Sequence, residues 1–393
     1  MRRAPALSFL LVTVFIDMLG LGIIVPIAPA LMTELTGSPA DAATWAGLIG
    51  SSYGLLQFLT APLLGRLADR YGRRPVLLAT LTCLGVDYLG HAVSDTVWLL
   101  LACHALAGAF AGTPTVINAY LADVTEPEDR ARGYGQIGAV FSLGFVAGPT
   151  IGGLLGAVDV RLPFYVAAAL ALANVAYGCL VLPESRPGDR TTKLSLRLAN
   201  PVGALAAVLR RPVLGRLTLA RFVADLARMT GQATWTFFVA AQFAWGTAQI
   251  GITMAASALA AAIFQARATG PVVRALGHRR AAVVGGSVAA AGSVGLAFAY
   301  EPWHVFALQG LGVLGSVAGA ATMAWISRTA GAAEQGTVQG AQTATIAIAE
   351  MAVPVTAGAL FAWSLSIGRP GLVFLAAACC MTAATIMLAR TRD

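Results

Sequence analysis

The chain carries the sequence Gly65-Arg-Leu-Ala-Asp-Arg-Tyr-Gly-Arg-Arg74 in a short charged break between two long apolar segments. A related break, Gly270-Pro-Val-Val-Arg-Ala-Leu-Gly-His-Arg-Arg280, follows in the second half of the chain. The two glycines have the same spacing in both stretches, and basic residues come directly after the second glycine. Because the pattern recurs in similar apolar surroundings, we interpret the chain as two related halves, each built from several apolar segments.

Apolar residues dominate the composition. Of the 393 residues, 58% are hydrophobic and only 11% are charged, whereas soluble domains are about 25% charged. This composition argues against a disordered chain and against an ordinary soluble enzyme, and it is typical of an all-α membrane protein. A helix needs about 20 apolar residues to cross the hydrocarbon core. Twelve segments meet this requirement: residues 7–32, 44–65, 76–94, 97–121, 133–157, 161–183, 213–240, 247–269, 280–299, 302–325, 335–362 and 370–390.

The basic residues alternate between successive breaks. Nearly all of them lie near the termini or in the breaks after even-numbered segments, and the opposite set of breaks holds only Arg161 and Arg369. Since loops rich in arginine and lysine stay in the cytoplasm, both termini are expected to face the cytoplasm. The longest break, residues 184–212, is basic and contains proline and glycine, so we expect a cytoplasmic linker between six-helix halves at 1–183 and 213–393.

Several classes of function find no support in the sequence. It has no P-loop, no GxSxG motif, no dinucleotide-binding glycine fingerprint and no metal-ligand spacing, so we expect neither an enzyme nor a bound cofactor or metal. The five cysteines are scattered through apolar segments, and we expect no disulfides. The formal charge of +8 comes from arginines in the short breaks, which indicates contact with a lipid bilayer and not with nucleic acid.

Four stretches connect these features to a known family. The segment 65–74 resembles the signature loop of the major facilitator superfamily, which lies between the second and third spans. The run Gly144-Phe-Val-Ala-Gly-Pro-Thr-Ile-Gly-Gly153 resembles the motif of the drug/proton antiporters in that superfamily. The runs 15–29 and 86–89 look like the tetracycline-efflux branch of this group. The resemblance implies the major facilitator fold, with twelve transmembrane helices, and a multi-pass exporter of the bacterial inner membrane.

The sequence departs from this branch in two respects. His104 stands where the family has an arginine in the fourth span. Ala289 and Ala261 occupy the places of an acid in the ninth span and a histidine in the eighth. The resemblance therefore implies export of drug-like small molecules, and it leaves the substrate itself open.

The resemblance assigns roles to two groups of residues. The signature loop and the acid at the end of the fourth span imply a conformational latch that closes the cytoplasmic side, formed by Gly65, Asp69, Arg70, Gly72, Arg73 and Asp123. The antiporter motif implies a seal of the fifth span against the opposite half, formed by Gly144, Gly148, Pro149, Gly152 and Gly153. Charge-driven anchoring explains the arginines equally well, and close helix packing explains the glycines.

Ionisable residues inside the apolar segments carry most of the functional information, because a charge at the centre of a bilayer is costly. A carboxyl or an imidazole in such a place is a candidate for reversible protonation. The candidate proton-coupling residues are Asp17, His104, Asp225 and Glu350. A structural role is the alternative for each of them. For Asp87, which precedes Tyr88 in the third segment, we favour a structural hydrogen bond.

The seventh segment carries a polar stripe at helical spacing, made by Arg221, Asp225, Arg228, Gln232 and Trp235. These side chains share one helix face, which is expected to line a central cavity. Asp225 can form a static pair with an arginine, or its protonation can release Arg228 for a substrate group. The candidate substrate-binding residues are Asp17, Gln57, Asn118, Gln136, Arg228, Gln232 and Trp235.

Our leading hypothesis is a monomeric, proton-coupled antiporter that exports drug-like molecules, with tetracycline-like compounds among them, by alternating access. A substrate molecule and protons would compete for one cavity, so that binding of one releases the other. One alternative is a proton-coupled transporter of an anionic metabolite or siderophore, whose carboxylate would bind an arginine of the seventh segment. Another is a non-transporting membrane sensor.

Overall fold

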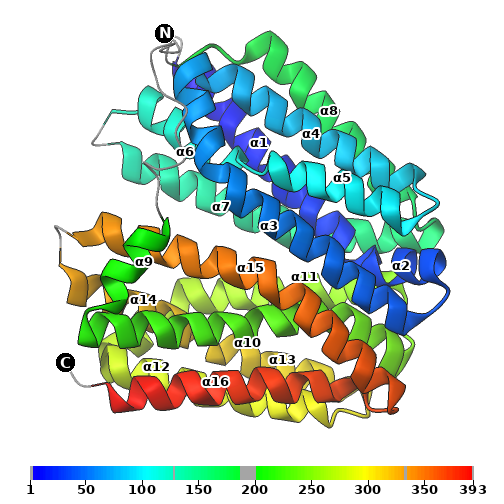
Figure 1. Ribbon diagram of the computed structural model, residues 1–393, viewed down its shortest axis with the longest axis vertical. Coiled ribbons are helices and arrows are strands. Elements are labelled where there is room, and N and C mark those ends of the chain that lie inside the picture. The colour runs from blue at the N-terminus through cyan, green and yellow to red at the C-terminus, as the bar shows by residue number, and fades with distance from the viewer. Residues whose placement is uncertain (1–2, 127–128, 186–200, 332–333, 392–393) are drawn as a thin grey trace. The chain divides into compact units, whose positions relative to one another are not determined.

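The computed structural model describes residues 3–126, 129–185, 201–331 and 334–391, and all regular structure within these ranges is helical (Figure 1). The chain divides into two compact units. Unit 1 comprises Met1–Gly37, Ser52–Ala199 and Gly246–Ala255, and unit 2 comprises Ser38–Ser51, Asn200–Trp245 and Ala256–Asp393.

Unit 1 is built mainly from the first eight helices. These are α1 (Arg3–Ile24), α2 (Ala28–Thr36), α3 (Pro39–Tyr71), whose first turns belong to unit 2, α4 (Arg73–Val93), α5 (Val97–Ala109), α6 (Thr113–Val124), α7 (Arg130–Val158) and α8 (Leu162–Val181). A short 3₁₀ turn, Val25–Ile27, separates α1 from α2 at Pro26, because proline removes a backbone donor. The apolar core of the unit gathers around Phe9, Leu77 and Tyr120.

Unit 2 holds most of the remaining helices. These are α9 (Pro201–Leu209), α10 (Pro212–Phe243), α11 (Thr247–Phe264), whose first turns belong to unit 1, α12 (Gly270–Ala297), α13 (Pro302–Gly315), α14 (Val317–Ala330), α15 (Gln335–Ser366) and α16 (Val373–Arg390). A π-helical turn, Gln265–Thr269, joins α11 to α12, and a 3₁₀ turn, Pro370–Leu372, precedes α16. The core of the unit gathers around Leu217, Trp325 and Ile326.

Nine stretches of described helix are long and apolar enough to cross a bilayer, and the bent pair Pro39–Ala61 and Leu63–Tyr71 would make a tenth. One of the nine, Thr247–Ala297, contains the eighth expected segment and nearly all of the ninth, and Gly277 interrupts it with a φ of 74°. The polar stripe lowers the hydropathy of α10, which is not among the nine. Each of the twelve expected segments lies largely in described helix, so the observed count fits twelve spans without confirming that number.

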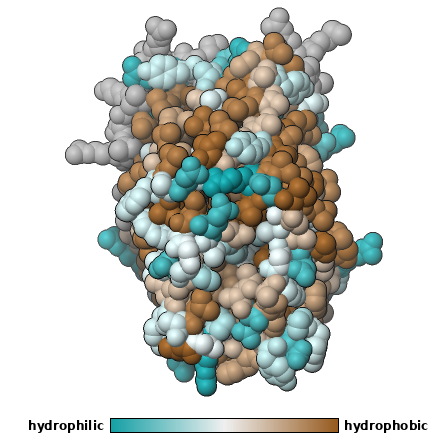
Figure 2. Space-filling view, turned by 90° about the vertical axis from the view of Figure 1, so that its right-hand side faces the viewer, coloured by the Kyte–Doolittle hydropathy of each residue, from teal (hydrophilic) through white to brown (hydrophobic). Residues whose placement is uncertain are grey.

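The surface is apolar over broad areas, as Figure 2 shows for one face. Leu180 and Val158 are 87% and 80% exposed, and Trp98 is 66% exposed. Exposed apolar side chains on this scale are unfavourable in water and favourable in lipid. The helices therefore have the composition and the surface of a polytopic membrane protein.

The linker expected at 184–212 falls largely on residues 186–200, which lie outside the described residues. Within the rest of this stretch, the helix α9 precedes α10, a helix that the sequence pattern did not predict. At the start of the stretch, Ser185 Oγ donates to Asp123 Oδ2 of α6 at 3.1 Å, and Glu184 contacts α4 as described below.

Candidate functional site

The polar stripe of α10 forms a hydrogen-bonded chain within unit 2. Arg221 Nε lies 2.8 Å from Asp225 Oδ2, and Arg228 Nε lies 3.3 Å from Asp225 Oδ1. Arg228 also donates from Nη1 to Gln232 Oε1 at 2.7 Å, and Arg221 donates from Nη1 to the Gly319 carbonyl oxygen at 3.0 Å. The expected pairing of Asp225 is therefore present with both arginines at once.

The hydrogen-bonded side chains of α10 are buried at Asp225 and exposed at Arg228. The Asp225 side chain is only 4% exposed, whereas that of Arg228 is 45% exposed. An exposed arginine near the middle of a membrane helix is stable where it meets water or a polar ligand, and not where it meets lipid. Two arginines share a single carboxylate, so the group keeps a net positive charge that a polar or anionic group on a ligand could contact.

Asp17 lies in the middle of α1 and is half-buried. No hydrogen bond or ion pair joins its carboxylate to another residue in the described ranges. One turn further along α1, Gly20 packs against the Tyr88 ring so closely that an added methyl group would lie 2.9 Å from the phenolic oxygen. Asp17 interacts electrostatically with Tyr88 of α4, and it lacks the bases that neutralise Asp225.

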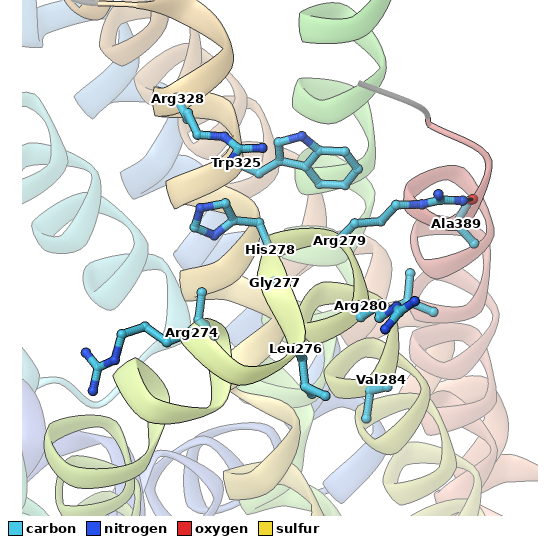
Figure 3. Close-up of a pocket in the computed structure, with 12 residues that line it drawn as sticks. Arg274, Leu276, Gly277, His278, Arg279, Arg280, Val284, Trp325, Arg328 and Ala389 are labelled. Carbon is cyan, nitrogen blue, oxygen red and sulfur yellow. Dashed lines mark hydrogen bonds between the residues drawn. The ribbon is translucent and has the colours of Figure 1, made fainter.

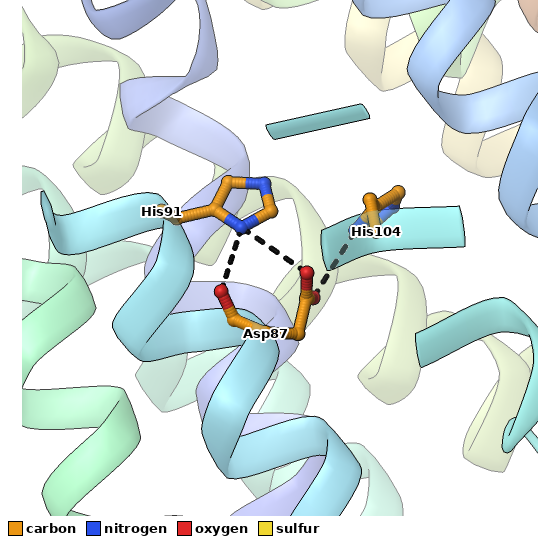
Figure 4. Close-up of side chains that lie close together, drawn as sticks. All are labelled: Asp87, His91 and His104. Atoms are coloured by element: carbon orange, nitrogen blue, oxygen red, sulfur yellow. Dashed lines mark hydrogen bonds and ion pairs between the residues drawn. The ribbon is translucent and has the colours of Figure 1, made fainter. Parts of the chain in front are cut away.

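His104 belongs to a three-residue cluster in unit 1 (Figure 4). His104 Nδ1 lies 3.1 Å from Asp87 Oδ2, and His91 Nδ1 lies 3.3 Å from Asp87 Oδ1 and 2.9 Å from the Asp87 carbonyl oxygen. The ring of His91 stacks on Phe164. The Asp87 carboxylate thus has a hydrogen bond with His104 and lies at ion-pair distance from His91, and its structural role stays a prediction. Their ligand atoms all lie within 4.8 Å of one another, so these three residues could also hold a metal ion.

The other candidate binding residues occupy separate helices. Gln57 of α3 and Gln136 of α7 are half-buried, and Asn118 of α6 is exposed, all within unit 1. In unit 2, Trp235 lies edge-on to Trp245 with ring centroids 6.4 Å apart, and its indole Nε1 is buried without a partner. The assignment of these residues to a substrate site stays a prediction. Glu350 of α15, a candidate for proton coupling, is half-buried, and its role also stays a prediction.

The residues expected to form the latch come together at the start of α4. Arg73 Nη1 lies 2.7 Å from Asp69 Oδ1, and Arg73 Nε lies 3.3 Å from Asp123 Oδ2. Gly72, between α3 and α4, has a φ of 102°, a conformation that favours glycine. The network lies entirely within unit 1. The geometry is that of the expected latch, and its effect on transport stays a prediction.

Glu184, which follows α8, completes this network and was missed by the sequence analysis. Its Oε1 accepts hydrogen bonds from the backbone N–H of Arg73 at 2.8 Å and of Arg74 at 3.3 Å. A carboxylate in this place satisfies free N–H groups at the start of α4 and meets the positive end of the helix dipole. Beside it, Arg74 Nη2 donates to the Cys179 carbonyl oxygen at 2.6 Å, near the end of α8.

We expect replacement of Arg73 by alanine to reduce transport by about tenfold, because a conformational coupling of this kind is typically worth that much. The change leaves Asp69 and Asp123 without their shared cation, while the helices keep their apolar contacts. Transport into inverted membrane vesicles, normalised to the amount of protein in the membrane, measures the effect. Arg132→Ala, which removes an exposed arginine at the start of α7, is the matched control. Normal transport by Arg73→Ala would contradict the role as a latch.

The antiporter motif packs α7 against α1 through its small residues. A methyl group added at Gly144 would lie 2.7 Å from the Phe15 carbonyl oxygen, and one at Gly148 would lie 2.7 Å from that of Leu19. Gly152 meets the Ile23 backbone in the same way, and Pro149 contacts Gly22. Three glycines of the motif thus serve the close packing of two helices within unit 1, which was the simpler of the two interpretations.

The fourth glycine of the motif contacts a different helix. Thr247 Oγ1, at the start of α11, donates to the Gly153 carbonyl oxygen at 3.0 Å. Gly251 of α11 lies against the Pro149 backbone. Residues Gly246–Ala255 belong to unit 1, so α7 also holds the first turns of a helix from the second half of the sequence.

Comparisons with known proteins give a consistent result. The family model of the Major Facilitator Superfamily matches residues 10–354. The chain is 36% identical to the class C tetracycline resistance protein of Escherichia coli over 366 residues, which cover 93% of this chain and 92% of that protein. It is 35% identical to the class G protein of Vibrio anguillarum, with 94% and 95% of the two chains covered.

A solved structure shares the fold at low sequence identity. The nucleoside transporter NupG superposes with a TM-score of 0.78 at 16% identity, and the match covers 98% of both chains. A likeness at this identity concerns the fold alone. It agrees with the fold that the signature loop implies.

Proposed function

Because the chain belongs to the major facilitator superfamily, whose model matches most of it, we propose that it is a proton-coupled antiporter that exports tetracycline-like drug molecules by alternating access. The observation that carries this proposal is Asp17, a carboxylate in an apolar span that has no hydrogen-bond or ion-pair partner in the described ranges. The names of the relatives, which are tetracycline resistance proteins, support the choice of substrate class.

The proton part of the proposal follows from the cost of an unpaired charge in a membrane. An ionised Asp17 is unfavourable in apolar surroundings unless water, a proton or a cationic ligand reaches it. Protonation and substrate binding are then alternative ways to neutralise one carboxylate, so that each displaces the other. One proton that moves inward through 100 mV releases about 2.3 kcal/mol, which can drive export.

The other candidate protonation sites differ in their surroundings. Asp225 has two arginine partners, so its protonation would leave Arg228 free to contact the substrate. His104 and His91 both contact the Asp87 carboxylate, so a proton on His104 would be stabilised by that carboxylate. Glu350 supplies a carboxylate in the second half of the chain, where Ala289 replaces the acid that the tetracycline-efflux branch carries. We propose that Asp17 carries the exchanged proton and that Asp225 adjusts the binding surface.

The substrate part of the proposal rests on the exposed end of the α10 stripe. Arg228 and Gln232 are exposed and offer several hydrogen-bond donors, and Trp235 of the same face can stack on a planar ring system. The membrane orientation follows from the arginine distribution. We propose that both chain termini and the latch face the cytoplasm of a bacterial cell, that the protein resides in the inner membrane, and that it works as a monomer.

Transport by inverted membrane vesicles tests the proposal. Vesicles that contain the protein should accumulate tetracycline when their interior is made acidic, and the accumulation should stop when the pH gradient is collapsed. Vesicles without the protein are the control. Accumulation that does not depend on the pH gradient would reject proton coupling.

The same assay separates the alternatives. Uptake of an anionic metabolite in place of tetracycline would favour the transporter of anions, although Asp225 neutralises part of the charge that such a substrate would need. No flux of any compound would favour a sensor. The relatives do not favour either alternative.

A further inference from the structure

Three polar side chains of the α4–α5 hairpin converge within unit 1 (Figure 4). Asp87 and His91 lie one turn apart on α4, and His104 comes from α5. Their ligand atoms all lie within 4.8 Å of one another. Two imidazoles and one carboxylate form a ligand set that binds divalent transition metals. The spacing in the sequence gives no indication of such a site, because the third ligand belongs to another helix.

The distances between the ligand atoms agree with a single small ion among them. His104 Nδ1 lies 3.1 Å from Asp87 Oδ2, and His91 Nδ1 lies 3.3 Å from Asp87 Oδ1. In a tetrahedral zinc site with bonds of about 2.0 to 2.1 Å, the ligand atoms lie about 3.3 Å from one another. Hydrogen bonds give similar distances, so the choice between a proton and a metal ion rests on the remaining contacts.

One oxygen of the Asp87 carboxylate lacks a hydrogen bond. Asp87 is only 2% exposed, and its Oδ1 is buried without a hydrogen-bond partner among the described residues. The neighbouring His91 Nδ1 makes its hydrogen bond, at 2.9 Å, with the Asp87 carbonyl oxygen, which already receives a donor within the helix. A buried oxygen without a partner is costly. A metal ion bound to Oδ1 would satisfy it, whereas a proton on His104 would not, because His104 faces Oδ2.

Aromatic neighbours hold the rings of both histidines. Phe164 of α8 stacks on His91 with ring centroids 5.4 Å apart, and the ring of Tyr53 of α3 lies 4.9 Å from that of His104. Ligands held in place by their surroundings favour metal binding. The His91 side chain is 10% exposed, whereas that of His104 is 28% exposed. The cluster is therefore open on the His104 side, where an ion can enter and a water molecule can complete its coordination.

We propose that Asp87, His91 and His104 bind a zinc ion or a chemically similar divalent transition metal ion. Neutral imidazole nitrogens favour such ions, whereas magnesium and calcium prefer oxygen ligands. Both histidines direct Nδ1 toward the carboxylate, so the ion binds the tautomers that carry their proton on Nε2. The bound ion ties α4 to α5 near their connection.

This proposal is independent of the proposed transport function. It concerns binding by residues of unit 1, and binding is measured without a substrate or a proton gradient. Failure of metal binding would therefore leave the proposed antiport standing. Success would remove His104 from the candidate proton-coupling residues whenever the ion is bound.

Metal titration of the purified full-length protein tests the proposal. The protein is prepared without a histidine tag, treated with a chelator and dialysed before zinc chloride is added. Calorimetry should show binding of zinc, and the melting temperature should rise, whereas magnesium chloride should produce neither effect. Cobalt chloride should give the strong visible absorption of a tetrahedral site. No binding of zinc or cobalt overturns the proposal, and equal binding of magnesium does so as well.

Variants of the ligands locate the ion. His104→Gln and Asp87→Asn should each weaken zinc binding by more than about a hundredfold, since even the outer partners of metal ligands contribute about 10- to 100-fold. His278→Gln, which removes a histidine that lines a cavity of unit 2 (Figure 3), is the matched control and should bind zinc normally. Zinc binding that persists in His104→Gln, or that weakens equally in the control, overturns the proposal.

A neighbouring thiol requires a control of its own. Cys103 precedes His104, and its sulfur lies so close to Gly90 of α4 that it would clash with a methyl group added there. Cys103→Ser should bind zinc as the natural chain does. Loss of binding in Cys103→Ser would place the ion at the thiol and contradict the proposed ligand set. If Asp87→Asn does not fold, His104→Gln still decides the outcome, because its amide can donate to the Asp87 carboxylate.

Discussion

Replacement of Asp17 by asparagine should abolish proton-driven export, with a loss on the order of a hundredfold in transport. Asparagine keeps the size of the side chain and its hydrogen-bonding oxygen, but it cannot release or take up a proton. Because Asp17 has no ion-pair partner in the described ranges, its neutralisation leaves no opposite charge uncompensated, and the protein should fold and insert normally. Accumulation of tetracycline in inverted vesicles under an imposed pH gradient measures the effect.

Asp17→Glu is the informative companion of this variant. It keeps the ionisable group and lengthens the side chain by one methylene, so part of the transport should return. Binding of tetracycline to the purified protein separates the two roles assigned to Asp17. Full gradient-driven transport by Asp17→Asn would show that the proton travels elsewhere, with Asp225 as the next residue to replace.

Replacement of Gly148 by leucine should prevent the protein from folding stably, so that little folded protein is present in the membrane. The new Cβ would lie 2.7 Å from both the Gly22 Cα atom and the Leu19 carbonyl oxygen, and these are backbone atoms that no rotamer change can move. Overpacking of this severity costs about 3 kcal/mol or more, a large part of the stability of a typical domain. The yield of monodisperse protein in size-exclusion chromatography, together with its melting temperature, measures the loss.

Gly138→Leu is the matched control for that change. Gly138 lies in the same helix, α7, but beyond the neighbouring backbone of that helix no described atom lies within 4 Å of the place where its Cβ would stand. This variant should therefore fold as the natural chain does. If both leucine variants fold equally well, the α1–α7 contact is looser than described.

Much of the fold can be predicted from the sequence because the bilayer leaves the chain few options. Apolar segments of sufficient length must form helices in a bilayer, and the arginine distribution predicts which ends of these helices face the cytoplasm. The membrane-spanning segments are harder to recognise from the sequence where they carry polar residues. The charged residues of α10 lower its mean hydropathy, so α10 is not recognised as a span by hydropathy alone. Gly277 divides a continuous helical stretch, and its positive φ marks the place of the division.

The contacts within the candidate site could be predicted only in part. The pairing of Asp225 with two arginines follows from helical spacing, and the contact of Arg73 with Asp123 follows from the family resemblance. Asp87 and His104 lie at nearly equal distances in sequence from the short α4–α5 connection. An antiparallel hairpin brings two such residues together, and this spacing could have revealed the cluster. Glu184 offers no such signal, because its contact with α4 depends on the packing of α8.

The α1–α7 contact has a consequence for energy coupling. At Gly22 and Gly148 the two backbones touch without intervening side chains, and a methyl group added at Gly22 would lie 2.9 Å from the Gly148 Cα atom. A water molecule needs space and polar partners, and this contact offers neither. A file of water cannot thread between these helices at that level. Under the proposed proton coupling, this contact would block a leak of protons between α1 and α7.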